Sequence, residues 1–221
     1  MSKTVFCTVM CWFMLHVPVY GQRDDVFGDS IVEAYYKAFE LNESRDYLQA
    51  YRQIVQTERA VDRVMSVKQV KVSGLSDSEF LYIYWPVKKS RAEIAYMLGL
   101  HTDMKVVSDE LRAALDKKRW ENDDVEAVKS IVGGLRADIA KIDGCRYYLV
   151  GQYDSSEVAL INALRFSQHY GNDAFINKVH DDLAQLYYKQ EKYDKSLAHL
   201  DSILSSPLYS DVVSRNKETK Q

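Results

Sequence analysis

Few side chains in this sequence of 221 residues have the types and spacing that could do chemistry. The best metal candidate is the run His180-Asp181-Asp182. Neighbouring residues of a helix point about 100° apart, so three consecutive side chains cannot easily converge on one ion. His199 is near in sequence, but no cysteine or glutamate completes a ligand set. The run therefore indicates a solvated helix surface.

Catalytic signatures are also missing from the sequence. It contains no G-x-S-x-G, no Walker loop, no H-E-x-x-H and no dinucleotide fingerprint. Gly133-Gly134 lies inside an apolar stripe with helical spacing, not after a strand, which does not fit a phosphate-binding loop. We therefore expect neither an enzyme nor a bound cofactor. An enzyme would require His180 to meet a distant Asp or Glu in the folded chain.

Composition and charge are those of a globular protein. Hydrophobic residues make up 47% of the chain and the net charge is −3, so no strong field for nucleic acid is expected. The basic runs at 88–91 and 117–119 are each followed by acidic residues, which is typical of solvated faces. The three prolines and nine glycines are few, which suits long helices.

The first 21 residues have the pattern of a secretory signal peptide. An apolar run from Val5 to Leu15 follows a single lysine, and Pro18 then ends any helix ahead of a cut before Gln22. The alternative is a retained anchor, but the run is well short of the ~20 residues that a spanning helix needs. We therefore expect export to the periplasm or cell envelope, without stable membrane insertion after cleavage.

Removal of residues 1–21 would leave Cys145 as the only cysteine. No intramolecular disulfide could then form, even in an oxidising compartment. A reactive thiol is one possibility, but burial on a helix face beside Gly144 is the commoner fate of such a residue. We expect Cys145 to be buried.

Apolar residues recur at helical spacing along most of the chain, most clearly in residues 183–207. The stripe of the first half breaks at Glu191-Lys192 and resumes in a second stripe that ends at Pro207. The small residues Ala184 and Ser196 stand where two helices would cross. This pattern predicts an antiparallel helical hairpin.

The hairpin resembles the tetratricopeptide repeat, in which a small residue is followed by an aromatic three positions later and by another that opens the second helix. Those residues are Ala184, Tyr187 and Tyr193 here. The second helix of the repeat continues with a small residue, two contact residues and a closing proline, here Ser196, Leu200, Ile203 and Pro207. Ile203 replaces a usual small residue, and the proline comes one residue early.

The same template fits three upstream stretches with decreasing fidelity. The small residues that mark the four copies are Ala38, Ala95, Gly144 and Ala184, and the gaps of 57, 49 and 40 residues exceed the family period of 34. A generic helical bundle is the alternative. The resemblance implies an all-α fold, with antiparallel hairpins stacked as a tetratricopeptide-like right-handed α-solenoid. It would span residues 22–207, with helix pairs at about 30–70, 77–118, 123–169 and 173–206, and a polar tail at 208–221.

The segment that opens the second pair is ambiguous. Ser76 and Glu79 have the spacing of a capping box, which starts a helix. Residues 80–85 have the composition of a buried strand, but the cap and the helical spacing that follows favour a helix kinked at Pro86.

The resemblance further implies a concave groove. In the family it is lined by the second, fifth, ninth, twelfth and thirteenth residues of each first helix. On this chain the candidate groove residues are Lys89, Tyr96, Lys141, Tyr148, Lys178, Asp181, Gln185, Tyr188 and Lys189. The subfamily that binds peptide carboxylates has Lys and Asn at the fifth and ninth positions. Lys141 fits, but Cys145 replaces the asparagine, so that mode is not supported.

A groove of Tyr, Lys and Gln suits an extended peptide or a partner helix. We therefore expect an exported scaffold that binds a protein or peptide, or the sensory part of a bacterial signalling system. The alternative is a small-molecule protein in which Tyr82, Trp85 and Tyr96 stack on a sugar. A deep aromatic pocket would favour the sugar, and an open groove would favour the peptide.

Overall fold

The structure is a computed structural model that describes residues 28–121, 124–167 and 172–208, and this part of the chain contains helices and no strand. The all-α prediction is confirmed. The expected signal peptide, and the tail from residue 209 onward, lie outside the described residues. The α-helices are α2 (Asp29–Glu43), α3 (Tyr47–Val67), α4 (Asp77–Glu79), α5 (Trp85–Met97), α6 (His101–Lys117), α7 (Val125–Leu149), α8 (Tyr153–Ser167), α9 (Asp173–Lys189) and α10 (Tyr193–Leu204).

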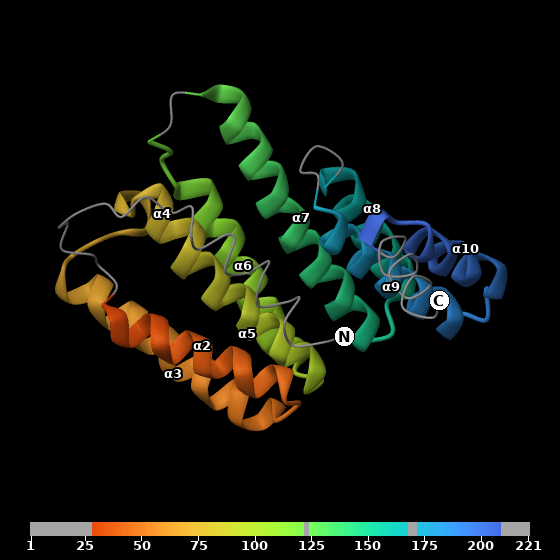
Figure 1. Cartoon of the computed structure of the whole chain (residues 1–221), viewed down its shortest axis with the longest axis horizontal. Coiled ribbons are helices and arrows are strands. Elements are labelled where there is room, and N and C mark those ends of the chain that lie inside the picture. The colour runs from red at the N-terminus through yellow and green to blue at the C-terminus, as the bar shows by residue number, and fades with distance from the viewer. Residues whose placement is uncertain (1–27, 122–123, 168–171, 209–221) are drawn as a thin grey trace, which may run out of the picture.

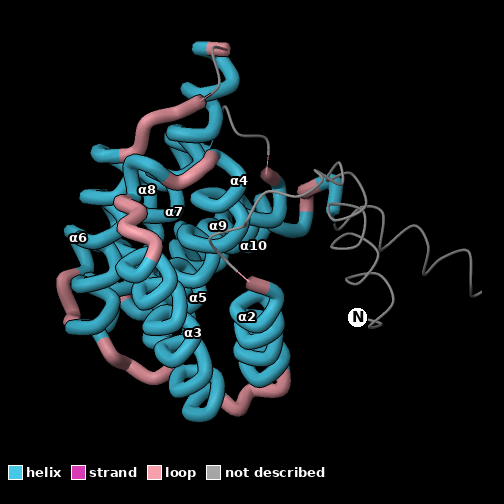
Figure 2. Tube along the Cα trace, turned by 90° about the vertical axis from the view of Figure 1, so that its left-hand side faces the viewer, coloured by secondary structure: helices cyan, strands magenta, loops and turns pink. Residues whose placement is uncertain are grey.

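The longer helices pack as successive pairs: α2 with α3, α5 with α6, α7 with α8, and α9 with α10. Figure 1 shows these pairs in chain order from the red and orange end to the blue end of the molecule. Turned by 90°, the described chain is again helices joined by short loops (Figure 2). No described helix is both long and apolar enough to cross a membrane.

The four pairs share one turn geometry. Each turn contains a residue with positive φ: Arg45 (64°), Gly99 (71°), Gly151 (75°) and Glu191 (61°). The N–H of the next residue donates to a carbonyl five residues back, in the bonds Asp46 to Leu41, Leu100 to Ala95, Gln152 to Tyr147 and Lys192 to Tyr187. This bond satisfies a carbonyl at the helix end and reverses the chain. The hairpins are therefore built alike.

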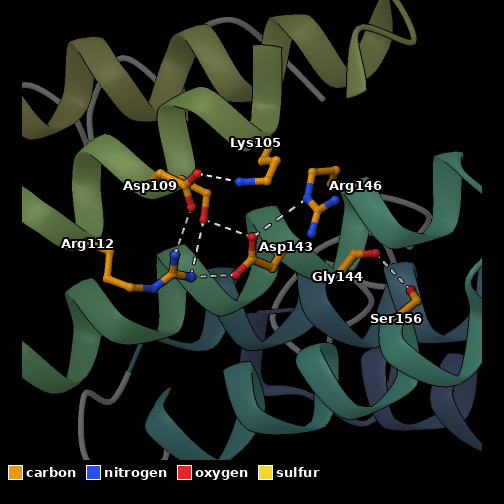
Figure 3. A network of polar contacts seen from close by, with 8 residues as sticks. Lys105, Asp109, Arg112, Asp143, Gly144, Arg146 and Ser156 are labelled. Atoms are coloured by element: carbon orange, nitrogen blue, oxygen red, sulfur yellow. Dashed lines mark hydrogen bonds and ion pairs between the residues drawn. The ribbon is translucent and has the colours of Figure 1, made fainter. Parts of the chain in front are cut away.

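This shared turn aligns the four hairpins residue by residue. A buried residue stands seven positions before the positive-φ residue, namely Ala38, Ala92, Gly144 and Ala184, and another stands five positions after it, namely Ala50, Met104, Ser156 and Ser196. Ser156 Oγ donates to the Gly144 carbonyl at 2.8 Å (Figure 3), and Ser196 Oγ donates to the Ala184 carbonyl at 2.9 Å. The second copy therefore differs in register from our alignment, because Ala92 occupies the place we assigned to Ala95.

The segment before α5 is helical, not a strand. Ser76 Oγ accepts from the Glu79 N–H at 3.2 Å, and the Ser76 N–H donates to Glu79 Oε2 at 2.8 Å, so the predicted capping box is confirmed. A 3₁₀ turn (Val72–Gly74) precedes it, and a π-helical turn, Phe80–Tyr84, follows α4. Pro86 then lies in the first turn of α5, which continues directly from the π-helical turn, and Pro86 has no N–H to donate to that turn.

Lys88 and Lys118, one from each basic run, are buried, so the prediction of a solvated face is wrong for these two lysines. Lys88 is 6% exposed and bonds Glu58 and, at 2.7 Å, Glu110. Arg91 bonds Glu58 at 2.7 Å and pairs with Asp103. This network joins α3, α5 and α6. Lys118 is equally buried and pairs with Asp77 at 2.9 Å, with its ammonium over the Trp120 ring.

A second polar network joins α6 to α7 (Figure 3). Asp143 accepts from Ser108 Oγ at 2.8 Å and pairs with Arg112 at 2.7 Å. Arg112 also pairs with Asp109, which holds Lys105 at 2.6 Å. This network and a buried apolar core that includes Leu111, Leu135 and Ile139 hold α7 against α6. On another side of α7, Ala137 packs in a second core with residues of α8 and α9.

Candidate binding cavity

A cavity of about 790 Å³ lies among α5, α7 and α9, with the α2–α3 turn on its rim. Each of the four hairpins contributes side chains from its first helix. They include Asn42 and Glu43 from the first, Glu93, Tyr96 and Met97 from the second, Lys141, Cys145 and Leu149 from the third, and Lys178, Asp181 and Gln185 from the fourth. Positions far apart in the sequence are thus gathered in one place.

Five of the nine predicted groove residues line this cavity, namely Tyr96, Lys141, Lys178, Asp181 and Gln185. Asp181 accepts a hydrogen bond from Gln185 at 2.9 Å, which holds these two side chains of α9 together.

The other four predicted residues do not line it. Lys89 is held by Asp138, with Nζ 2.7 Å from Oδ1. Tyr148 packs against Tyr153 across the α7–α8 turn, with ring centroids 6.1 Å apart. Tyr188 is 67% exposed and meets the Tyr193 edge, and Lys189 is exposed beside it. The end of α9 is therefore separate from the cavity.

The most consequential lining residue that the sequence analysis missed is Glu93. With Ala92 as the small residue of the second hairpin, Glu93 takes the ninth position and Met97 the thirteenth, both of which face the groove in the resembled family. The earlier alignment was three residues late. Gly99 was the signal that could have corrected it, because a glycine just past a helix end marks the turn.

The charged groups of the cavity act on one another. Asp182 Oδ2 lies 3.2 Å from Lys141 Nζ, and both side chains are largely buried. Burial raises the pKa of Asp182 despite this lysine. Burial alone would lower the pKa of Lys141, but the charges around it, including those of Asp182 and Glu93, raise it instead. Lys141 therefore remains a cation.

Cys145 is buried as expected, at 4% exposure, against this ion pair. Burial raises the pKa of the thiol far above its ordinary value, and the nearby Asp182 carboxylate raises it further. The thiol is thus neutral at physiological pH, and a neutral thiol is neither a good nucleophile nor a metal ligand.

Glu93 behaves differently from Asp182. Burial would raise the pKa of its carboxyl, but the charges of Lys89, Lys178 and Lys141 outweigh that effect and hold the pKa below its ordinary value. Glu93 is therefore ionised. No described residue forms a hydrogen bond or ion pair with its carboxylate.

The aromatic groove of the alternative hypothesis is not assembled. Trp85 is 3% exposed, packs against Phe80 and donates from Nε1 to Asp138 at 3.1 Å. Tyr82 is 56% exposed, away from the cavity lining, to which only Tyr96 of the three contributes. These three rings therefore cannot stack on one sugar.

The three side chains of the metal candidate contact different partners, but the predicted solvated surface is wrong for Asp182, which is largely buried. Asp181 bonds Gln185, Asp182 faces Lys141, and His180 Nδ1 lies 2.8 Å from His199 Nδ1 of α10. Across the described ranges, no group of three or more His, Cys, Asp or Glu side chains could hold a metal ion. What the cavity offers is hydrogen bonding and charge.

No family model matches this chain, and no curated protein or solved structure matches it significantly.

Proposed function

We propose that this protein is an exported scaffold with tetratricopeptide-like helical repeats, and that it binds a protein or peptide segment in the cavity among α5, α7 and α9. The observation that carries the proposal is the convergence of groove-facing positions from four similarly built hairpins on one cavity. A surface assembled from successive hairpins is suited to a ligand that extends along them.

The lining chemistry favours a peptide over a small apolar ligand. Pockets for small molecules are mostly apolar with a few polar groups. This cavity instead has seven charged lining residues, together with two amide side chains, Asn42 and Gln185. Amides can bond both the N–H and the C=O of an extended main chain, so they suit a peptide of variable sequence.

Export is part of the proposal and is supported by the sequence pattern of residues 1–21. Cys145 is compatible with an oxidising compartment, because a buried neutral thiol resists oxidation and exchange.

Selection from a displayed library of random peptides, about 12 residues long, tests the binding function. The immobilised chain should enrich sequences that lose binding when Asp181 and Gln185 are both changed to alanine. These side chains are exposed and bonded to each other, so their removal should leave the fold intact. The matched control is Glu126→Ala with Lys129→Ala, an exposed pair on α7 outside the cavity.

Two results would contradict the proposal. Selected peptides that bind the Asp181→Ala, Gln185→Ala variant as well as wild type would place the binding site elsewhere. Failure to enrich any sequence would remove the peptide-binding function itself.

A further inference from the structure

Glu93 is one of the acceptors in this cavity that no described residue bonds. It lies on α5 in the cavity lining, and its two oxygens could accept about four hydrogen bonds. Of the three lysines whose charges act on Glu93, Lys89 pairs with Asp138 at 2.7 Å and Lys141 lies 3.2 Å from Asp182, whereas Lys178 forms no ion pair with a described residue. The Glu93 side chain is partly exposed in the cavity wall, so a ligand group can reach its carboxylate. The site is therefore suited to an incoming N–H donor.

The charge balance of the lining agrees with a cationic donor. Four carboxylates and three basic groups line the cavity, so the lining carries one net negative charge. A ligand group with a single positive charge would neutralise it. The acidic lining residues are Glu43, Glu93, Asp181 and Asp182, and the basic ones are Arg45, Lys141 and Lys178.

The walls beside Glu93 fit the rest of a basic side chain. Tyr96, one turn along α5, presents an aromatic ring, which attracts an ammonium or guanidinium group. Met97 and Ile142 line the same cavity and can contact the methylene stem of lysine or arginine.

We propose that Glu93 binds a lysine or arginine side chain of the peptide segment that occupies this cavity. The inference rests on the proposed peptide-binding function and specifies its ligand. Tyr96 and the aliphatic walls hold the stem of that side chain, and the Glu93 carboxylate accepts hydrogen bonds from its charged end.

The test uses four pools of blocked nonapeptides on the immobilised full chain. The central residue of each pool is Lys, Arg, Gln or Glu, and the other positions are randomised among uncharged residues. Retention is quantified by mass spectrometry on wild type, Glu93→Gln and the matched control Glu126→Gln. Glu126 is an exposed glutamate of α7 outside the cavity. Circular dichroism melts verify that the variants fold.

The Lys and Arg pools should be retained about tenfold more than the Gln pool, as for a charge-assisted hydrogen bond in a partly desolvated site. Glu93→Gln should remove this preference, and Glu126→Gln should keep it. Equal retention of all pools, preference for the Glu pool, or a basic preference that survives in Glu93→Gln would overturn the inference alone. Retention of no pool by wild type would overturn the proposed function with it.

Discussion

At the residue scale, Gly144 shows most directly how tightly these helices cross. A Cβ built on it would lie 2.6 Å from Leu160 Cγ and 3.3 Å from the Leu160 backbone nitrogen. Leu160 is buried in the core that α7, α8 and α9 share, with Ala137 and Leu183 in the same cluster, so its side chain cannot easily move away. The glycine therefore permits both the close approach of α7 and α8 and the bond from Ser156 to its carbonyl.

Gly144→Ala should lower the free energy of unfolding by about 1–3 kcal/mol, as overpacking of a filled core does. Gly133→Ala is the control on the same helix, because its added Cβ would meet only the Phe166 carbonyl at an ordinary 3.5 Å. That change should be neutral or stabilising by up to about 1 kcal/mol through helix propensity. Urea unfolding measures both, and equal effects would show that the crossing at Gly144 is looser than described.

Cys145 gives a second test at this scale. Its burial and its raised pKa predict that the native thiol reacts with iodoacetamide at pH 8 many times more slowly than the same thiol in denaturant. Modification is read at the Cys145 peptide by mass spectrometry, so that Cys7 and Cys11 do not interfere. Rapid native labelling would mean that the cavity floor opens to solvent.

At the element scale, the α9–α10 hairpin is held in part by a pair of histidines. His180 and His199 meet through Nδ1 at 2.8 Å, and His199 stacks on the Tyr187 ring, whose hydroxyl donates to Glu157 at 2.7 Å. One imidazole must be neutral to accept the bond. Burial lowers the pKa of His180. Burial is also the main cause that lowers the pKa of His199, and the charges of His180 and Lys195 lower it further, whereas the charge of Glu157 raises it.

This pair should make the hairpin sensitive to acid. Because both folded-state pKa values lie below the ordinary 6.5, the unfolded chain binds protons first as the pH falls through 6.5. The free energy of unfolding should therefore decrease between about pH 7 and pH 5. Thermal melts across this range should show a smaller decrease in His199→Gln than in wild type.

The control for that experiment is His101→Gln, at an exposed position that opens α6. It should keep the wild-type pH dependence. If His199→Gln and His101→Gln behave alike, the acid sensitivity comes from other groups and the histidine pair has no part in it.

At the scale of the whole molecule, α7 connects the two halves. Its residues Leu135, Ile139 and Ile142 enter the core shared with α5 and α6, whereas Ala137 enters the core shared with α8 and α9. This helix lines part of the cavity, so the shape of the cavity depends on both cores. The first half is fastened in addition by the buried network of Glu58, Lys88 and Arg91.

Lys88→Met should destabilise the molecule by about 3 kcal/mol, because it leaves the buried Glu58 carboxylate with one cation fewer. Lys105→Met removes an exposed lysine paired with Asp109 and should change the free energy of unfolding by less than about 0.5 kcal/mol. Urea unfolding of both variants measures the difference. A Lys88→Met protein as stable as wild type would indicate that methionine packing compensates for the lost ion pairs.

The sequence by itself determined the local structure, because helix periodicity, capping and small residues at crossings are set by neighbours along the chain. The all-α class, the Ser76–Glu79 cap and the small residues Ala38, Gly144 and Ala184 were all predicted in this way. The burial of Cys145 was predicted because burial is the commoner fate of a cysteine on a helix face. Five cavity residues were also named, four because their helix register was right, and Tyr96 because the ninth and twelfth positions of the family, three residues apart, both face the groove.

Only the tertiary structure decided the pairings between distant residues. Lys88, an apparent surface lysine, is buried because Glu58 of another helix lies opposite it. Trp85 is buried because its ring packs against Phe80 and its Nε1 donates to Asp138 of another helix. Glu93 was overlooked because a shift of three residues keeps the apolar face of a helix nearly in place, so periodicity alone could not distinguish Ala92 from Ala95. The turn at Gly99 resolves them, because Ala92 stands seven positions before this positive-φ residue, as the small residues of the other hairpins do.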